Sequence, residues 1–272
     1  MNTTAKQINP SSTTAEDMVL QEFCNGVATL TLNRPRQFNA LSEAMLTSLQ
    51  EKLERITENY SVRLVILQGA GKVFCAGHDL KEMIATREKT YFKTLFKQCS
   101  RMMMTLNQMP QPVIARVHGI ATAAGCQLVA ACDLAVAAED TRFATSGINV
   151  GLFCSTPAVP VSRNIPRKKA MELLLTGDFI DANTALSWGL LNRVAPLEKL
   201  DEEVKKLADS IIAKSSVAVS TGKKMFYKQL ESKMEDAYAF ASEIMACNMM
   251  ADDVTEGVDS FINKRQAVWK GR

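Results

Sequence analysis

The chain has 272 residues, of which 47% are hydrophobic and 22% are charged. This is enough for one core domain with an appendage and too little for several large domains. The 32 basic and 29 acidic side chains give a formal net charge of +3, without a basic run typical of nucleic-acid binding. No apolar stretch reaches the length of about 18 residues that a membrane span needs. We therefore expect neither a nucleic acid nor a membrane as a partner.

The amino-terminal segment and the cysteines bear on location. Residues 1–17 are rich in Ser and Thr and contain no arginine and no apolar stretch, so we expect a disordered tail without a targeting signal. The seven cysteines include no C-x-x-C pair. An odd number of thiols in mostly apolar sequence indicates a reducing compartment. From these features we expect a cytoplasmic location.

Strand and helix patterns alternate from residue 18 onward. Residues 18–23 and 27–32 alternate as strands do, and Asn25-Gly26 between them is a strong hairpin signal. Ser42 is the expected N-cap of a helix with apolar residues spaced three and four apart. The elements expected next are a strand at 64–68, a long helix at 88–108, a strand at 113–117, a short helix from 124 and a strand at 133–137. Alternation of strands with helices predicts an α/β fold with crossover connections.

The sequence after Pro196 is helical throughout. An apolar face begins at Leu200, and further helices are expected at 216–230, 234–250 and 253–265. The predicted organisation is therefore a tail (1–17), a core that carries the ligand site (18–197) and a helical oligomerisation region (198–272). The Met-rich stretch at 244–250 is interpreted as core or subunit interface rather than a ligand site.

Two loops have the composition of an anion-stabilising site. The first, 71–80, follows an expected strand and so projects from the end of the sheet where α/β proteins place ligands. The second, 119–127, is rich in small residues and leads into a helix, whose amino terminus favours negative charge. With Gly77 turning the backbone outward, amides from both loops would converge as an oxyanion hole.

Distinctive motifs lie in and around these loops: Leu32-Asn33-Arg34-Pro35, Phe38-Asn39-Ala40-Leu41, the FCAGHDL stretch at 74–80, Gly125-Cys126-Gln127-Leu128, Cys132-Asp133, Leu175-Thr176-Gly177, the A-x-x-x-G-L stretch at 185–190 and the FINKR stretch at 261–265. As a set, they resemble the motifs of the enoyl-CoA hydratase/isomerase (crotonase) family. Together they span almost all of the chain beyond the tail. The details at 76–79, 121–127 and 150–156 resemble one subgroup of the family in particular.

This resemblance implies a crotonase-like spiral of ββα turns with a C-terminal helical trimerisation region, usually assembled as a trimer or a hexamer. It implies an acyl-CoA thioester as ligand, with coenzyme A as substrate carrier and without a tightly bound cofactor or a metal. The backbone amides of His78 and Ala124 would form the oxyanion hole. The coenzyme A contacts that it implies are Arg34, Ala76, Gly77, Asp79, Leu80, Lys81 and, from a neighbouring subunit, Phe261 and Lys264.

The family's acid/base residues do not carry over to this chain. Gln127 and Gly147 stand where its hydratases have two glutamates, and Ser155 falls where a dienoyl-CoA isomerase has an aspartate. Because positioned acid/base groups contribute about 10²- to 10⁴-fold to a rate, we do not expect ordinary water addition. Restoring both carboxyls, as Gln127→Glu with Gly147→Glu, is expected to raise a hydration rate.

Three functions stay open from the sequence. The first is an enzyme that acts through an oxyanion without the glutamate pair, such as a decarboxylase, a thioesterase or an atypical isomerase. The second is a non-catalytic acyl-CoA-binding or regulatory protein, and the third is a hydratase that uses a different acid/base group. For His78 the amide is favoured over the imidazole as the functional group. Cys126 and Cys154 are interpreted as inert thiols, and His118 as a structural side chain.

Overall fold

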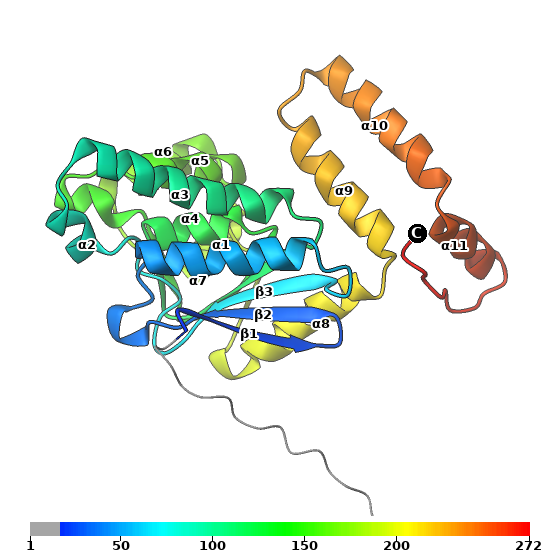
Figure 1. The fold of residues 1–272 in the computed structure, drawn as a ribbon, viewed down its shortest axis with the longest axis horizontal. Helices are drawn as coiled ribbons and strands as arrows, with labels where there is room; N and C mark the ends of the chain where they lie inside the picture. Colours follow the sequence, from blue (N-terminus) through cyan, green and yellow to red (C-terminus); the bar gives the residue numbers. More distant parts are fainter. Residues whose placement is uncertain (1–16) are drawn as a thin grey trace, which may run out of the picture.

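Six strands form the main sheet of the part of the chain that the structure, a computed structural model, describes, which is residues 17–272 (Figure 1). In sheet order they are β1 (Val19–Cys24), β2 (Val27–Leu32), β3 (Leu64–Gly69), β4 (Val113–Val117), β6 (Leu134–Ala138) and β9 (Arg193–Ala195). β1 and β2 are the predicted hairpin, with Asn25 and Gly26 both at positive φ, and every later pairing is parallel. The predicted α/β class is confirmed. The expected tail lies, except for Asp17, outside the described residues.

A second, smaller sheet stacks the turns of the chain on one another. It contains β5 (Ile120–Thr122), β7 (Arg142–Ala144) and β8 (Ile180–Asp181), and Cys75 extends it through a parallel bridge to Ala121. Each turn therefore contributes a strand to the main sheet, a short strand to the second sheet and then a helix, as in β4-β5-α4. This is the ββα succession that the resemblance implies.

Helices cover both faces of the main sheet. α1 (Glu43–Thr57), α3 (Lys89–Gln108) and α4 (Ala124–Ala131) pack on one face, and α8 (Leu200–Ile212) packs on the other (Figure 1). The side chains of β3 alternate accordingly, with Val65 and Leu67 in the first core and Leu64 in the second. The predicted helical region 198–272 thus begins with a helix that covers the sheet. Ser42 caps α1 as predicted, accepting a hydrogen bond from the Met45 amide.

Four shorter helices and three 3₁₀ turns complete the core. The helices are α2 (Leu80–Ala85), α5 (Ser155–Asn164), α6 (Arg167–Thr176) and α7 (Ala182–Trp188), and the turns are η1 (Pro35–Gln37), η2 (Ser146–Val150) and η3 (Leu197–Lys199). None of these, nor the second sheet, was placed by periodicity, because segments of two to ten residues show too little of a repeat.

The last three helices form an arm that extends away from the core (Figure 1). They are α9 (Ser216–Gln229), α10 (Met234–Met249) and α11 (Asp252–Ile262), close to the predicted bounds. α11 ends earlier than predicted, because Lys264 takes a positive φ and Arg265 turns back to pair with Glu256 and Asp259. No residue of α9 or α10 is fully buried within the described part of the chain, and the arm exposes large apolar side chains: Phe226, Leu230, Met234, Tyr238, Met245, Met249, Met250 and Phe261.

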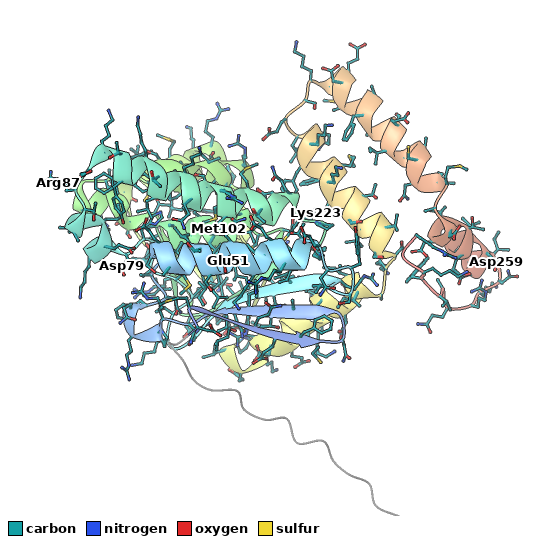
Figure 2. All side chains as sticks on the ribbon, in the orientation of Figure 1. Glu51, Asp79, Arg87, Met102, Lys223 and Asp259 are labelled. Carbon is teal, nitrogen blue, oxygen red and sulfur yellow. The ribbon has the colours of Figure 1, made fainter. Side chains whose placement is uncertain are left out.

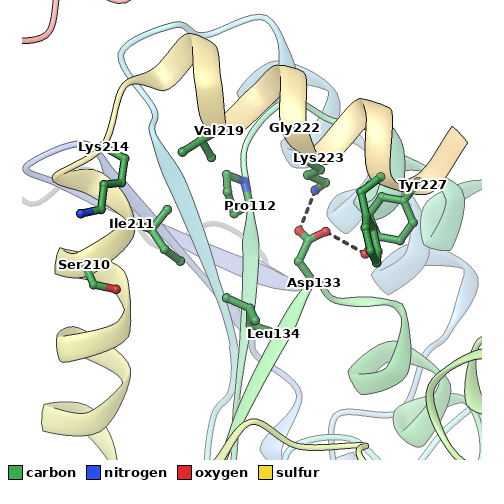
Figure 3. A pocket seen from close by; sticks show the side chains of 11 residues that line it. Pro112, Asp133, Leu134, Ser210, Ile211, Lys214, Val219, Gly222, Lys223 and Tyr227 are labelled. Carbon is green, nitrogen blue, oxygen red and sulfur yellow. Dashed lines mark hydrogen bonds and ion pairs between the residues drawn. The ribbon is translucent and has the colours of Figure 1, made fainter. Parts of the chain in front are cut away.

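A buried ion pair fastens this arm to the sheet. Lys223 of α9 lies 2.7 Å from Asp133 at the start of β6, and Tyr227 donates a 2.8 Å hydrogen bond to the same carboxylate (Figure 3). Lys223 also donates to the Leu106 and Gln111 carbonyls. A mostly apolar cavity of about 470 Å³ opens beside this network. Asp133 therefore acts as a structural anchor.

Candidate functional site

Hydrogen bonds join the two loops predicted to form the site. Phe74 and Cys75 donate to the His118 and Ile120 carbonyls, and the Thr122 amide donates back to the Cys75 carbonyl. Gly125 allows this approach, since a Cβ there would lie 2.1 Å from the Cys75 oxygen. The predicted convergence of loops 71–80 and 119–127 is therefore present in the fold.

Gly77 lies at a further close contact between these loops. Its φ is +94°, and a Cβ on it would lie 2.9 Å from the Ala123 Cβ and 3.1 Å from the Ala124 amide nitrogen. The His78 amide follows Gly77 directly in the chain, so the His78 and Ala124 amides lie close together. Neither amide donates a hydrogen bond to another residue within the described range, 17–272.

The backbone is strained immediately before the second amide. Ala123 has φ 50° and ψ −119°, a conformation that residues with a Cβ rarely adopt, and it directly precedes the first residue of α4. Such strain costs about 1–3 kcal/mol and persists where the surrounding structure enforces it. Here the Ala123 amide donates to the Ala144 carbonyl, which fixes the turn. The helix start leaves the Ala124 N–H without an acceptor inside α4.

Asn39 holds the first loop in place and was quoted in a motif without a role. Its side-chain amide donates to the carbonyls of Ala70, Val73 and Phe74, and it is fully buried at a φ of 53°. Asparagine tolerates this left-handed conformation better than most residues. The pairing of a turn-forming Asn with a loop more than thirty residues away leaves no local signal in the sequence.

Two of the predicted coenzyme A contacts are engaged with each other. Arg34 forms a half-buried ion pair with Asp79 at 3.1 Å and also donates to the Ala40 carbonyl. Asp79 in turn caps α2 by accepting from the Lys81 and Glu82 amides. These side chains hold the loop. Leu80 and Lys81 are exposed beside them, and Ala76 is half-buried.

The remaining predicted contacts lie far from this loop within one chain. Phe261 and Lys264 stand at the end of α11 and are exposed. Figure 2 places Asp259 of α11 and Asp79 at opposite ends of the molecule. A contact from this region to a coenzyme A site needs a second subunit, as the resemblance implies.

The positions of the missing glutamates differ in their surroundings. Gln127 is 3% exposed on α4, and its side-chain oxygen accepts no hydrogen bond from a described residue. Gly147 has no positive φ, yet a Cβ on it would lie 2.6 Å from the Leu152 oxygen and 2.8 Å from the Cys154 sulfur. The expected rescue by two glutamates remains a prediction; at Gly147 the Leu152 carbonyl and Cys154 occupy the space that a side chain would need. Ser155 is exposed at the start of α5.

The thiols near the site are held in their neutral form. Burial raises the pKa of Cys126 to about 12, and burial also raises the pKa of Cys154. His118 donates from Nε2 to the Gly71 carbonyl at 2.8 Å. Within residues 17–272, no group of three or more His, Cys, Asp or Glu side chains is placed to hold a metal ion, and no helix is long and apolar enough to cross a membrane.

Comparison with known proteins identifies the family. Residues 22–272 match the family described as Enoyl-CoA hydratase/isomerase. The chain belongs to this family. It is 46% identical over 245 residues to rat enoyl-CoA hydratase domain-containing protein 3, mitochondrial, covering 90% of this chain and 82% of the relative. The subgroup suggested by the details at 76–79, 121–127 and 150–156 is this one.

Solved structures of family members share the fold. The human protein of the same subgroup has 44% sequence identity and a TM-score of 0.90, with 93% of this chain and all of that chain covered. A Mycobacterium smegmatis enoyl-CoA hydratase has 55% identity and a TM-score of 0.92, with 93% and 99% covered. The predicted crotonase fold is confirmed.

The expected cytoplasmic location is contradicted by this comparison. The rat, frog and human relatives are all named as mitochondrial proteins. The expectation rested on the lack of a recognisable targeting signal in residues 1–17 and on free thiols, and free thiols indicate a reducing compartment without saying which one.

Proposed function

We propose that this enoyl-CoA hydratase/isomerase family member binds an acyl-CoA thioester and stabilises negative charge on its carbonyl oxygen. The observation that carries the proposal is the pair of free amides, His78 and Ala124, that meet at Gly77. Preorganised backbone donors of this kind are typically worth about 2.7–4 kcal/mol each in a transition state. The start of α4 adds its positive end to the same place.

The reaction is proposed to differ from ordinary hydration. Glutamine at 127 and glycine at 147 offer no carboxyl for the two proton transfers of water addition. An oxyanion-stabilising site without that pair fits a decarboxylase, a thioesterase or an atypical isomerase acting on an acyl-CoA. A non-catalytic acyl-CoA-binding role is the alternative, and turnover of a panel of enoyl-, malonyl- and hydroxyacyl-CoA esters separates the two.

The test of carbonyl binding uses butyryl-CoA labelled with ¹³C at the thioester carbonyl. Calorimetry is expected to give a Kd in the micromolar range, about −8 kcal/mol. Infrared difference spectra are expected to show the carbonyl stretch shifted to lower wavenumber on binding, because two donors polarise the bond. Binding without any such shift, or no binding of acyl-CoA by folded protein, overturns the proposal.

A pair of proline variants isolates the amide. Ala124→Pro removes the N–H at the first position of α4. It is expected to abolish the carbonyl shift. Ser216→Pro makes the same change at the first position of α9, in the arm, and is expected to keep the shift. Circular dichroism of both variants establishes that they are folded.

The exposed apolar side chains of the arm support a proposal on assembly. Three large side chains of the arm, Met234 and Tyr238 on α10 and Phe261 on α11, are each 70% or more exposed. Such exposure is unusual for a monomer. We propose that this face is covered by other subunits in a trimer or hexamer, which would also bring Phe261 and Lys264 to a neighbour's site. Light scattering that shows a monomer of about 30 kDa able to bind acyl-CoA contradicts this.

A further inference from the structure

The imidazole of His78 is held in one tautomer. Its Nδ1 lies 3.4 Å from the carbonyl oxygen of Leu41, and Leu41 is fixed there because its amide donates to the Gly77 carbonyl and its carbonyl accepts from the Asp79 amide. A carbonyl oxygen can only accept a hydrogen bond, so the hydrogen of the neutral ring is on Nδ1. The lone pair is therefore on Nε2.

This lone pair is buried without a donor. Nε2 of His78 receives no hydrogen bond from any residue between 17 and 272, and the ring stands edge-on to Phe96 with centroids 5.5 Å apart. Desolvation lowers the pKa of His78 below its ordinary value of 6.5, more than the Leu41 carbonyl raises it. A buried acceptor without a partner costs about 1–3 kcal/mol. An unpaired buried acceptor of this kind calls for a specific explanation.

The other site residues named from the sequence, together with His118, do not offer a free acceptor of this kind. Gln127 is an amide and Gly147 has no side chain. Asp79 already accepts from Arg34 and from the start of α2. The Cys126 thiol, with its pKa of about 12, stays protonated at neutral pH. Of the described histidines, His118 uses its Nε2 as a donor to the Gly71 carbonyl.

We propose that Nε2 of His78 is the proton acceptor of this site, and that it removes a hydrogen from the carbon next to the thioester carbonyl of a bound acyl-CoA. The proposal rests on the acyl-CoA function proposed above. The C–H bond breaks and its electron pair forms a carbon–carbon double bond to the carbonyl carbon. The carbonyl π pair moves to the oxygen, which the His78 and Ala124 amides stabilise. The proton becomes the Nε2–H of an imidazolium whose Nδ1–H stays on Leu41.

The substrate class follows from this step. The acyl group must carry at least one hydrogen on the carbon next to the thioester carbonyl. When the imidazolium loses its Nε2 proton to solvent and takes up another before it reprotonates the enolate, the ester returns with solvent hydrogen on that carbon, even when no product forms. This makes the proposal testable without knowledge of the physiological reaction.

The experiment incubates butyryl-CoA with the protein in D₂O and follows the loss of the proton signal next to the carbonyl by NMR. Wild-type protein is expected to speed this exchange by about 10²- to 10⁴-fold over the solution rate. His78→Gln keeps the backbone amide and a side-chain donor for Leu41, but its amide accepts no proton. It is expected to exchange at the solution rate.

Controls separate this inference from the proposed function. His118→Gln replaces the other histidine with a side chain that can still donate to the Gly71 carbonyl, and it is expected to exchange at the wild-type rate. Calorimetry with butyryl-CoA is run on each protein. Wild-type binding without exchange, or exchange by His78→Gln at the wild-type rate, overturns the role of His78 and leaves the proposed function standing. Absence of acyl-CoA binding overturns both.

The pH profile gives a readout that a merely structural histidine would not change. Three carboxylates act on the neighbouring part of α3. Desolvation is the largest cause that raises the pKa of Tyr91 there, and the charges of Glu43 on α1, Glu82 on α2 and Asp79 raise it further. They are not among the causes that set the pKa of His78. The exchange rate is therefore expected to be constant above pH 6.5 and to fall at a pH below it, as Nε2 becomes protonated. A rate that stays constant down to pH 4.5 contradicts the proposal.

Discussion

Gly147 decides whether the family's second glutamate can be restored. A Cβ at this position would lie 2.6 Å from the Leu152 carbonyl oxygen and 2.8 Å from the Cys154 sulfur, distances that real Cβ atoms essentially never show. The Leu152 amide donates to the Gly147 carbonyl at 3.0 Å, so the loop cannot open without losing that bond. We therefore expect Gly147→Ala to cost about 1–3 kcal/mol of unfolding free energy, as overpacked cores do. Gly147→Glu should cost at least as much.

The contact with Cys154 allows this reasoning to be checked by a double-mutant cycle. Cys154→Ala removes the sulfur, while the Leu152 oxygen stays. Gly147→Ala combined with Cys154→Ala is therefore expected to cost less than the sum of the single changes, by about 0.5 kcal/mol or more. Urea unfolding followed by circular dichroism measures each free energy. For a chain of this size, each kcal/mol corresponds to about 2–4 °C in Tm.

The same argument predicts the outcome for activity. Gln127→Glu is nearly isosteric and is expected to fold, although its buried carboxyl has no described donor. Adding Gly147→Glu is expected to give no recovery of crotonyl-CoA hydration, measured by the absorbance of the conjugated thioester. Two results refute the reasoning. One is Gly147→Ala as stable as wild type, and the other is a double-glutamate variant that hydrates crotonyl-CoA at about 10 per second.

Three further predictions follow from the loops and the arm. Gly77→Ala is expected to reduce acyl-CoA affinity by at least tenfold, whereas Gly151→Ala, also at positive φ but facing open space, should leave affinity within twofold; calorimetry decides. Ala123→Gly relieves a strained φ and is expected to raise the free energy of unfolding by up to about 1 kcal/mol, measured by urea denaturation. A decrease of the same size would contradict the claim that Ala123 is strained. Asp133→Asn leaves Lys223 buried without its partner and is expected to cost about 3–5 kcal/mol. In that last case, a Tm unchanged from wild type shows that the ion pair does not anchor the arm.

Local sequence patterns determined the parts of this fold that depend on neighbouring residues. The hairpin at Asn25-Gly26, the cap at Ser42 and the long helices were all predicted close to their observed bounds. Turn residues, caps and apolar spacing act within a few positions of the chain. The two site loops were also predicted, because each follows a strand and contains the small residues that close backbone contact requires.

Tertiary contacts decided what periodicity could not. α8 was assigned to the oligomerisation region, yet it packs on Leu64, Ile114 and Val136 of the sheet, because its apolar face matches a face that other strands create. The arm helices beyond it have equally apolar sequences and no such face within the chain. Apolar spacing predicts that a helix will bury one side and does not say against what.

The chemistry of the site shows the same division. The sequence by itself indicated, through its resemblance to the family, that Gln127 and Gly147 stand at the positions of the hydratases' two carboxyls. The three-dimensional structure decided that Gly147 has no room for a side chain and that Leu41 fixes the His78 tautomer. Both facts depend on carbonyl groups positioned by separate turns of the fold. A carbonyl oxygen is present at every position of every chain, so its place in space leaves no trace in the sequence.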